Sequence, residues 1–322
     1  MIKKLIIIII IISVRVFLAS GQNEPPKMPD GYRSNTTLKI AYAFGTLKLV
    51  DKEPPVPKDI IKYSDLVYKK VGDRRLKLDI YHRKNINKPA PLLIFIHGGA
   101  WKKGDRDDYR KYLIDFANKG YVTATITYRL SEEAKFPAAV NDVKCAVKWL
   151  KFNAEKYFIN PDKIAVIGGS AGGHLAMMIG YSSDVAEFKK GCGETNVDSR
   201  VQVVVNLYGP SDLRSKIAKE TSSVQEFIGK SYDKAPVAYK KATPLTYLSK
   251  DDPPTLIFHG TLDELVPVEQ SDILNTKLKN VGIVSEYHKL KGWPHTMDLG
   301  KEVNEYCQYY MNRFFEKYIP MD

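Results

Sequence analysis

The chain contains few cysteines and, beyond its first 21 residues, no long apolar run. Three cysteines in 322 residues are too few to form a disulfide framework. Cys145, Cys192 and Cys307 also lie too far apart for the usual ligand spacing of a zinc site. We therefore predict no metal and no other cofactor. In an exported protein one cysteine pair can oxidise, but the spacing does not choose which pair.

Acidic residues are outnumbered, since 37 Asp and Glu stand against 49 Lys and Arg, a formal charge of +12. Such a surplus suggests nucleic acid or an anionic surface as a partner. The lysines, however, are scattered among acids along the chain and form no basic stripe. The phosphate-loop pattern Gly-x-x-x-x-Gly-Lys-Ser/Thr is also absent. We therefore expect no nucleic-acid partner.

The N-terminus has the pattern of a secretory signal peptide. Lys3 and Lys4 precede an apolar run over residues 5–12, and small residues lead to Gly21. A membrane anchor is the less favoured alternative, because Arg15 interrupts a run shorter than the roughly 20 residues of a span. We predict a signal peptide over residues 1–21, a secreted or periplasmic location, and no stable membrane insertion of the mature chain. Cleavage removes three bases and no acid, which leaves 46 against 37, or +9.

Residues 22–62 differ in composition from the rest of the chain. Six prolines punctuate residues 25–57, so regular structure is not expected across residues 22–60. We interpret residues 22–62 as an N-terminal extension.

From residue 63 onwards, strand and helix patterns alternate. Strands are predicted at 76–81, 91–96, 121–128, 163–167, 201–207, 255–258 and 284–290, and helices at 109–119, 138–157, 268–280 and 298–317. This alternation predicts the α/β class, with one doubly wound domain over residues 63–322, a mostly parallel sheet and helices on both faces. Residues 210–250 are rich in Pro, Ser and Lys and break the rhythm, which predicts a small cap or lid insertion.

Ser170 is the predicted nucleophile. It lies in Gly-x-Ser-x-Gly, directly between the strand at 163–167 and an apolar segment that begins Ala171-Gly172-Gly173. A serine at such a strand-to-helix turn has strained backbone angles, and neighbours without bulky side chains let the turn close. The hydroxyl then stands at the carboxyl edge of the sheet, within reach of a base. The alternative is a glycine-rich turn with an inert serine.

A second glycine-rich segment, His97-Gly98-Gly99-Ala100-Trp101, follows the buried strand at 91–96. Acyl transfer builds negative charge on a carbonyl oxygen, which backbone N–H groups can stabilise. We assign an oxyanion hole to the N–H groups of Gly99, Ala100 and Ala171, the last of which follows the nucleophile. His97 itself is expected to be structural.

A serine nucleophile needs a base that is oriented by an acid. Among six histidines, His295 lies in an exposed turn after the last predicted strand, whereas His174 and His259 are better explained as structural. Asp263 lies in a loop after the strand at 255–258. The chain order Ser170, Asp263, His295 is that of α/β-hydrolases. Glu264 and Asp298 are the alternative acids.

The residues from 65 to 320 resemble the α/β-hydrolase superfamily and, within it, bacterial carboxylesterases that include feruloyl- and acetylxylan-esterase-like enzymes. The resemblance implies that Ser170, Asp263 and His295 form the triad and that Asp142 and Arg129 are structural. It also implies that Trp101 and Trp293 face the substrate. The segments that carry the resemblance are 76–81, 97–101, 128–130, 136–139, 160–166, 168–176, 208–213 and 259–263.

Two positions depart from a neighbouring branch of the superfamily. Esterases that resemble hormone-sensitive lipase usually carry His-Gly-Gly-Gly and Gly-Asp-Ser-Ala-Gly, where this chain has Ala100 and Gly169. The match therefore favours the feruloyl-esterase-like branch.

We predict an exported serine carboxylesterase that acts on a small-molecule or oligosaccharide ester, with acetyl or feruloyl esters of plant polysaccharides as candidate substrates. One alternative is another acyl hydrolase on the same triad, a peptidase or a formamidase. The other is a non-catalytic binding protein on a hydrolase scaffold, against which the intact Ser170, Asp263 and His295 argue. The oligomeric state is not predicted.

Overall fold

The computed structural model describes residues 24–189, 191–193 and 196–321. The predicted signal peptide, residues 1–21, lies outside these residues. Within the described part of the chain, no helix is both long enough and apolar enough to cross a membrane.

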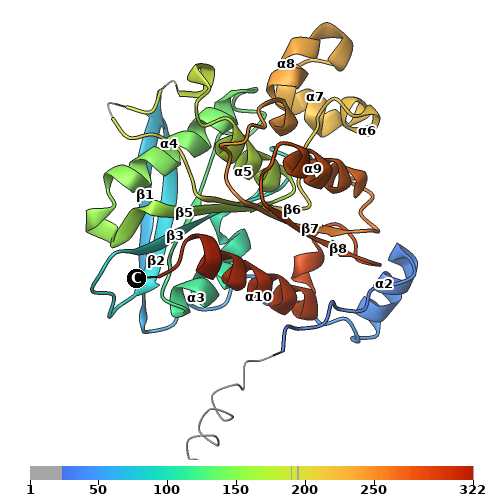
Figure 1. Cartoon of the computed structure of the whole chain (residues 1–322), viewed down its shortest axis with the longest axis horizontal. Coiled ribbons are helices and arrows are strands. Elements are labelled where there is room, and N and C mark those ends of the chain that lie inside the picture. The colour runs from blue at the N-terminus through green and yellow to red at the C-terminus, as the bar shows by residue number, and fades with distance from the viewer. Residues whose placement is uncertain (1–23, 190, 194–195, 322) are drawn as a thin grey trace, which may run out of the picture.

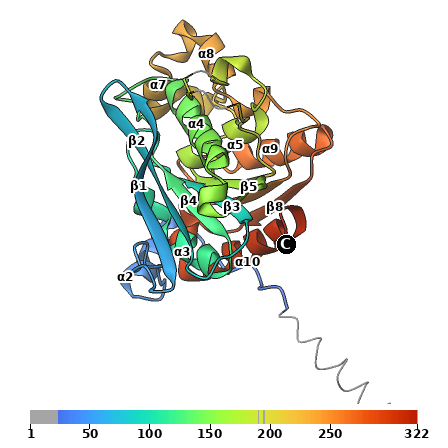
Figure 2. The same ribbon diagram turned by 90° about the vertical axis from the view of Figure 1, so that its left-hand side faces the viewer.

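In the described part of the chain, eight strands form one sheet in the order β1-β2-β4-β3-β5-β6-β7-β8. β1 and β2 pair antiparallel, as do β2 and β4, and every later pairing is parallel. The mostly parallel sheet that the sequence predicts is therefore confirmed, with an antiparallel pair at one edge (Figures 1 and 2). The strands are β1 Ile60–Val71, β2 Arg74–Arg83, β3 Ala90–Ile96, β4 Val122–Ile126, β5 Ile159–Gly169, β6 Val203–Leu207, β7 Thr255–Gly260 and β8 Ser285–Leu290.

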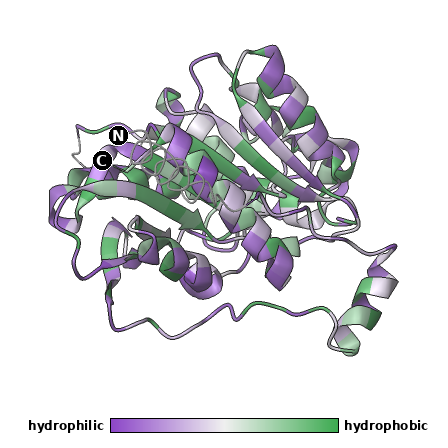
Figure 3. Cartoon of the chain, turned by 60° about the horizontal axis from the view of Figure 1, so that its bottom comes forward, coloured by the Kyte–Doolittle hydropathy of each residue, from purple (hydrophilic) through white to green (hydrophobic). Residues whose placement is uncertain are grey.

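Helices cover both faces of the sheet, as expected. α4 (Ala138–Phe152), α5 (Ala171–Tyr181) and α9 (Glu269–Asn280) pack on one face, and α3 (Arg110–Asn118) and α10 (Lys301–Tyr318) on the other (Figure 1). β3 is buried along its whole length because its side chains alternate between the two layers: Ile94 joins one core and Phe95 the other. Apolar residues accordingly concentrate in the strands of Figure 3.

The described part of the extension contains the helix α2 (Asn35–Ala43), so the expectation of no regular structure over residues 22–60 is wrong there. Ser34 caps this helix: its hydroxyl accepts the N–H of Thr37, and the Thr37 hydroxyl accepts the N–H of Ser34. Such a cap satisfies backbone donors that the first turn leaves free. The chain then runs along the outside of the domain from α2 to β1 (Figure 3).

Residues 210–250, between β6 and β7, hold three short helices at one end of the molecule (Figures 1 and 2). They are α6 (Lys216–Glu220), α7 (Ser222–Ile228) and α8 (Pro236–Lys241). The fold thus carries a small insertion at the predicted place.

Two long-range links tie α4 to its surroundings. Cys145, on α4, forms a disulfide with Cys192 across 47 residues of sequence, and Cys307 is free and buried. Asp142, also on α4, is fully buried and receives hydrogen bonds from Nε and Nη2 of Arg129 at 2.7 and 2.9 Å. Asp142 and Arg129 therefore hold the segment after β4 against α4, which agrees with the structural role that the resemblance implies for them.

Candidate active site

Ser170 lies at the junction of β5 and α5 with φ 55° and ψ −123°. A residue with a Cβ rarely adopts this conformation, and backbone hydrogen bonds hold it here. The Ser170 N–H donates to the carbonyl of Leu207 at 2.9 Å, and its own carbonyl accepts the N–H of His174 at 3.0 Å. A Cβ on Gly172 would lie 2.0 Å from the carbonyl oxygen of Ile96, so the glycine lets α5 approach β3 closely. The turn therefore has the geometry expected of a nucleophile elbow.

Asp263 and His295 meet although 32 residues separate them. His295 Nδ1 lies 2.6 Å from Asp263 Oδ2, and the other carboxylate oxygen accepts the N–H groups of Leu265 and Val266 at 2.9 and 2.8 Å. Because Nδ1 faces a carboxylate, it carries the proton, which leaves Nε2 of a neutral His295 free to accept one.

A second histidine contacts the same carboxylate. His259 Nε2 lies 3.1 Å from Asp263 Oδ2 and 2.9 Å from the carbonyl of Val266, while its Nδ1 lies 2.7 Å from the hydroxyl of Ser271. Since Nε2 faces two acceptors, it donates, and Nδ1 accepts from Ser271. The structural role expected for His259 is thus specific, because it helps to hold Asp263. In the sequence, the contact between His259 and Asp263 is indicated only by their separation of four residues in the motif His259-Gly260-Thr261-Leu262-Asp263.

The hydrogen bonds around Asp263 determine its charge. Burial raises the pKa of this carboxyl, but hydrogen bonds from His259 and His295, together with the N–H of Val266, outweigh burial and lower the pKa from 3.8 to about 2. Asp263 is therefore ionised at neutral pH and stabilises a protonated His295.

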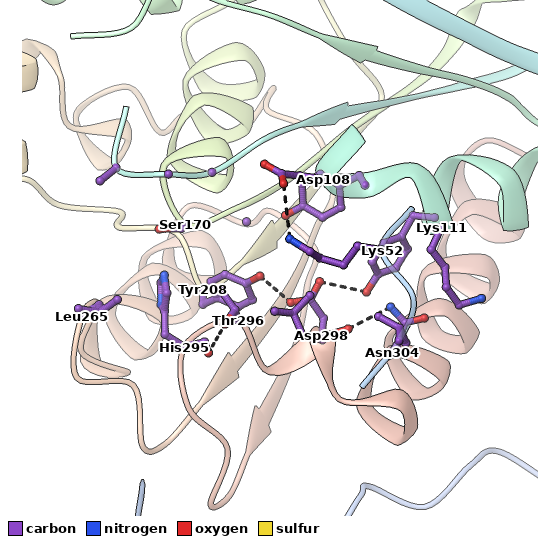
Figure 4. Close-up of a pocket in the computed structure, with 18 of the residues that line it drawn as sticks. Lys52, Asp108, Lys111, Ser170, Tyr208, Leu265, His295, Thr296, Asp298 and Asn304 are labelled. Atoms are coloured by element: carbon purple, nitrogen blue, oxygen red, sulfur yellow. Dashed lines mark hydrogen bonds and ion pairs between the residues drawn. The ribbon is translucent and has the colours of Figure 1, made fainter. Parts of the chain in front are cut away.

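The alternative acids lie elsewhere. Glu264 is exposed. Asp298 is buried, but its carboxylate accepts the hydroxyls of Tyr208 at 2.5 Å and of Tyr112 at 3.3 Å. The Tyr208 ring packs edge-on against His295, with ring centroids 4.7 Å apart (Figure 4). Asp298 therefore supports His295 indirectly, by holding the Tyr208 hydroxyl. The sequence analysis did not predict the contact between Tyr208 and Asp298. The one signal for it was weak: Asp298 lies three residues after His295.

The glycine-rich loop after β3 touches the elbow. Gly99, Ala100 and Trp101 all have positive φ, at 93°, 56° and 58°. A Cβ on Gly98 would lie 2.8 Å from the carbonyl oxygen of Gly169, which shows how closely the two segments approach. This placement is compatible with N–H donors from Gly99, Ala100 and Ala171, and that assignment stays a prediction.

Two cavities adjoin the elbow, and Ala100, Ser170, Leu265 and His295 line both. The larger has a volume of about 340 Å³ and the smaller about 140 Å³. Figure 4 shows the larger cavity, with Ser170 and His295 at one end. The surface of this cavity is mostly apolar, but its far end carries the polar or charged residues Lys52, Asp108, Lys111, Tyr112, Asp298 and Asn304. The smaller cavity lies against α6 and α7 and is largely apolar, lined by residues such as Trp101, Ile217, Ala218, Val224 and Val266.

Trp101 and Trp293, the two tryptophans that the resemblance implies to face the substrate, differ in their surroundings. Trp101 borders the smaller cavity but is only 2% exposed, and its ring stacks on Phe227 with centroids 4.5 Å apart. Trp293 is 3% exposed, packs edge-on against Tyr32, and donates its indole N–H to the carbonyl of Pro29 at 3.1 Å. The expectation that Trp293 faces the substrate is therefore wrong, because this side chain anchors the N-terminal extension.

Within the described residues, no group of three or more His, Cys, Asp or Glu side chains is placed to hold a metal ion. The arrangement around Ser170 instead suits acyl transfer: a serine on a strained turn, a histidine and an ionised acid that contact each other, and a backbone loop at the same cavity.

The fold and this site define an α/β hydrolase, and comparison with known sequences agrees. The profile of the BD-FAE family matches residues 78–278. The chain therefore belongs to the BD-FAE family of α/β-hydrolase esterases.

Esterase LipC of Mycobacterium tuberculosis (strain ATCC 25618 / H37Rv) is 32% identical over 230 residues, which are 69% of this chain and 57% of that protein. Esterase LipQ of the same organism is 30% identical over 273 residues, 82% of this chain and 64% of that protein. The chain thus spans less than two thirds of the length of these relatives.

Among solved structures, a truncated carbohydrate esterase from gut microbiota is similar with a TM-score of 0.74 and 26% identity, and the match covers 82% of this chain and 99% of that one. An acetyl ester-xyloside bifunctional hydrolase from Caldicellulosiruptor lactoaceticus is similar with a TM-score of 0.68 and 26% identity, over 76% of this chain and 89% of that one.

Proposed function

We propose that this protein is a serine carboxylesterase that hydrolyses esters through an acyl-enzyme. The observation that carries the proposal is that Ser170, on its strained turn, lines the same cavity as His295, whose Nδ1 is hydrogen-bonded to Asp263. The mycobacterial relatives named as esterases support the same reaction class.

The proposed reaction has two halves. His295 Nε2 takes the proton of the Ser170 hydroxyl while the Ser170 oxygen attacks the ester carbonyl. The N–H groups of Gly99, Ala100 and Ala171 stabilise the oxyanion that forms. Collapse breaks the ester bond, and the leaving alcohol takes the proton from His295. Water then gives a proton to His295 and attacks the acyl group, and the Ser170 oxygen takes that proton back from His295 as the acid leaves.

The substrate that the site favours is a short-chain ester of a polar alcohol. The cavity of about 140 Å³ is small enough to restrict the acyl group, and the larger cavity, although its surface is mostly apolar, also carries the charged side chains of Lys52, Asp108 and Lys111. Esters of carbohydrates fit this division, and two structural neighbours are described as a carbohydrate esterase and an acetyl ester-xyloside hydrolase. Acetyl esters are therefore the first candidates, with feruloyl esters as the bulkier alternative.

The test compares the chain from Gln22 with its Ser170→Ala variant on 4-nitrophenyl acetate and on a 4-nitroanilide of the same acyl group. We expect ester hydrolysis by the parent chain, a loss of at least about 10³-fold in the variant, and little action on the anilide. Labelling of the parent chain by a fluorophosphonate, and not of Ser170→Ala, separates an enzyme from a binding protein. Hydrolysis that survives the substitution undiminished refutes the mechanism.

We also propose that the protein is exported. The pattern of residues 1–21 supports this, and so does the Cys145–Cys192 disulfide, because disulfides persist mainly in oxidising compartments. Expression of the whole chain, followed by N-terminal sequencing of the secreted or periplasmic product, is expected to find Gln22 first. An intracellular product that begins at Met1 contradicts the proposal.

A further inference from the structure

The segment between α2 and β1, residues 44–59 and here called the strap, is held beside the active site. Leu49 and Gly300 form an antiparallel bridge. The N–H of Val50 donates to the carbonyl of Leu299 at 2.9 Å, and the N–H of Lys301 donates to the carbonyl of Lys48 at 2.8 Å. These contacts hold the strap against the turn that follows His295.

From this position the strap contributes Val50 and Lys52 to the larger cavity, which Ser170 and His295 also line. The Lys52 side chain extends from the strap towards Asp108, and its ammonium lies 3.7 Å from that carboxylate (Figure 4). The Lys52 and Asp108 side chains are 47% and 39% exposed. An ion pair that long and that exposed is weak, so the ammonium can exchange Asp108 for an acceptor on a bound molecule.

Hydrogen bonds join several of the side chains that line the cavity together with Lys52. The buried carboxylate of Asp298 holds the hydroxyls of Tyr208 and Tyr112, and its backbone carbonyl accepts the side-chain amide of Asn304 at 3.0 Å. All four of these side chains line the cavity. These buried groups bond one another, so the charged side chains of Lys52, Asp108 and Lys111 are the groups that a bound molecule can reach at this end of the cavity. Charged donors and acceptors side by side suit a ligand with several hydroxyls, since each hydroxyl can both donate and accept.

The space continues past the strap. A second hollow of about 460 Å³ shares Val50, Lys111 and Asn304 with the active-site cavity. Its remaining lining residues come from the strap, the end of α3 and α10, and most of them have polar or charged side chains: Leu49, Asp51, Asp115, Lys119, Lys301, Glu305, Gln308 and Tyr309. A chain of sugar units that begins at Ser170 therefore has room to extend along the strap, past charged side chains such as Lys111 and Lys301.

We propose that the strap is a wall of the substrate site and that Lys52 is a specificity-determining residue, which selects esters whose alcohol portion carries several hydroxyls. This inference rests on the proposed esterase function. The acyl group occupies the smaller apolar cavity under α6 and α7, and the alcohol portion occupies the larger cavity, where the Lys52 ammonium hydrogen-bonds one of its hydroxyls.

The experiment uses acetates that differ only in their alcohol: monoacetylated xylotriose, cyclohexyl acetate and 4-nitrophenyl acetate. Lys52→Met keeps the apolar stem and removes the charge. Lys48→Met is the matched control, because Lys48 is an exposed lysine on the same strap that does not line the larger cavity. A charge-assisted hydrogen bond predicts that Lys52→Met lowers kcat/KM for acetylated xylotriose about tenfold, mainly through KM. We expect changes below about threefold for cyclohexyl acetate and no change with Lys48→Met.

A steric variant tests the wall separately. Val50→Trp narrows the cavity at the strap and is expected to lower kcat/KM more for acetylated xylotriose than for 4-nitrophenyl acetate. Thermal melting of every variant shows whether the fold is intact. Equal losses on the polar and apolar acetates, or no loss with either variant, overturn the inference while leaving the esterase function standing.

Direct binding keeps the two proposals distinguishable. If the parent chain hydrolyses none of the acetates, the proposed function fails, and calorimetric titration with unmodified xylotriose still tests the strap. Binding that Lys52→Met weakens about tenfold and Lys48→Met leaves unchanged supports the inference. Equal binding by the parent chain and Lys52→Met, or no binding by either, refutes it.

Discussion

Asp263→Asn is the sharpest test of the proposed triad, because the structure shows what the amide cannot do. The Asp263 carboxylate accepts four hydrogen bonds, two on each oxygen, from His295, His259 and two backbone N–H groups. An asparagine has a single acceptor oxygen, so either rotamer turns its NH₂ group towards two of these donors.

Each buried donor left without an acceptor costs about 1–3 kcal/mol. The lowered pKa of Asp263 gives a separate lower bound on this loss of stability. A fall from 3.8 to about 2 corresponds to about 2 kcal/mol of folding free energy at neutral pH. We therefore expect the free energy of unfolding of Asp263→Asn to be lower than that of the parent chain by at least about 2 kcal/mol.

The effect on catalysis is larger than the effect on stability. To avoid facing an amide donor, His295 shifts its proton from Nδ1 to Nε2, and the nitrogen that would accept the Ser170 proton is then occupied. The same exchange in a characterised serine protease lowers kcat about 10⁴-fold, and we expect a loss of about 10³-fold or more.

The assay is steady-state hydrolysis of 4-nitrophenyl acetate together with urea unfolding. Glu264→Gln is the matched control, since Glu264 is the adjacent acid and is exposed, and it should retain activity within about twofold. Asp298→Asn tests the rival acid. Asp263→Asn activity above a tenth of the parent value, or a greater loss with Asp298→Asn, refutes the assignment of Asp263.

Three further outcomes are expected. Gly172→Ala should lower stability by at least about 2 kcal/mol and reduce kcat, measured by melting and hydrolysis, because its Cβ would overlap the Ile96 carbonyl; a neutral result contradicts the close packing. Cys145→Ser should cost about 4 kcal/mol from the 47-residue separation that it opens, and dithiothreitol should lower the Tm of the parent chain but not of the variant. The Asp263 pKa is depressed, so its stabilisation is complete above pH 4 and fades as the pH falls towards 2; the difference in unfolding free energy between the parent chain and Asp263→Asn should shrink over that range, and a constant difference contradicts it.

The core of the site could be predicted because its signals are local. The strained turn at Ser170 needs a strand, small neighbours and a helix start, all within one short stretch of sequence. Asp263 and His295 each follow a strand of a parallel sheet, and the carboxyl ends of such strands meet at one edge. The mostly parallel sheet with helices on both faces also followed from the alternation of strands and helices.

Other features depend on contacts between segments far apart in sequence. Trp293 looked like a substrate-facing residue beside His295, but the carbonyl that receives its indole N–H is 264 residues away, at Pro29. The prolines of the extension suggested irregular structure, yet Ser34 caps a helix there. β1 was not predicted, because charged and polar residues interrupt its apolar pattern on an edge strand that is only partly buried.

The amino-acid sequence by itself determined the fold class, the nucleophile turn and the candidate triad, because periodicity, turn chemistry and chain order act over short distances. Only the tertiary structure decided which cysteines pair, that His259 shares the Asp263 carboxylate, and that the strap brings Lys52 to the cavity of Ser170. Those contacts depend on how distant backbones approach one another in the packed domain, and no local pattern records such an approach.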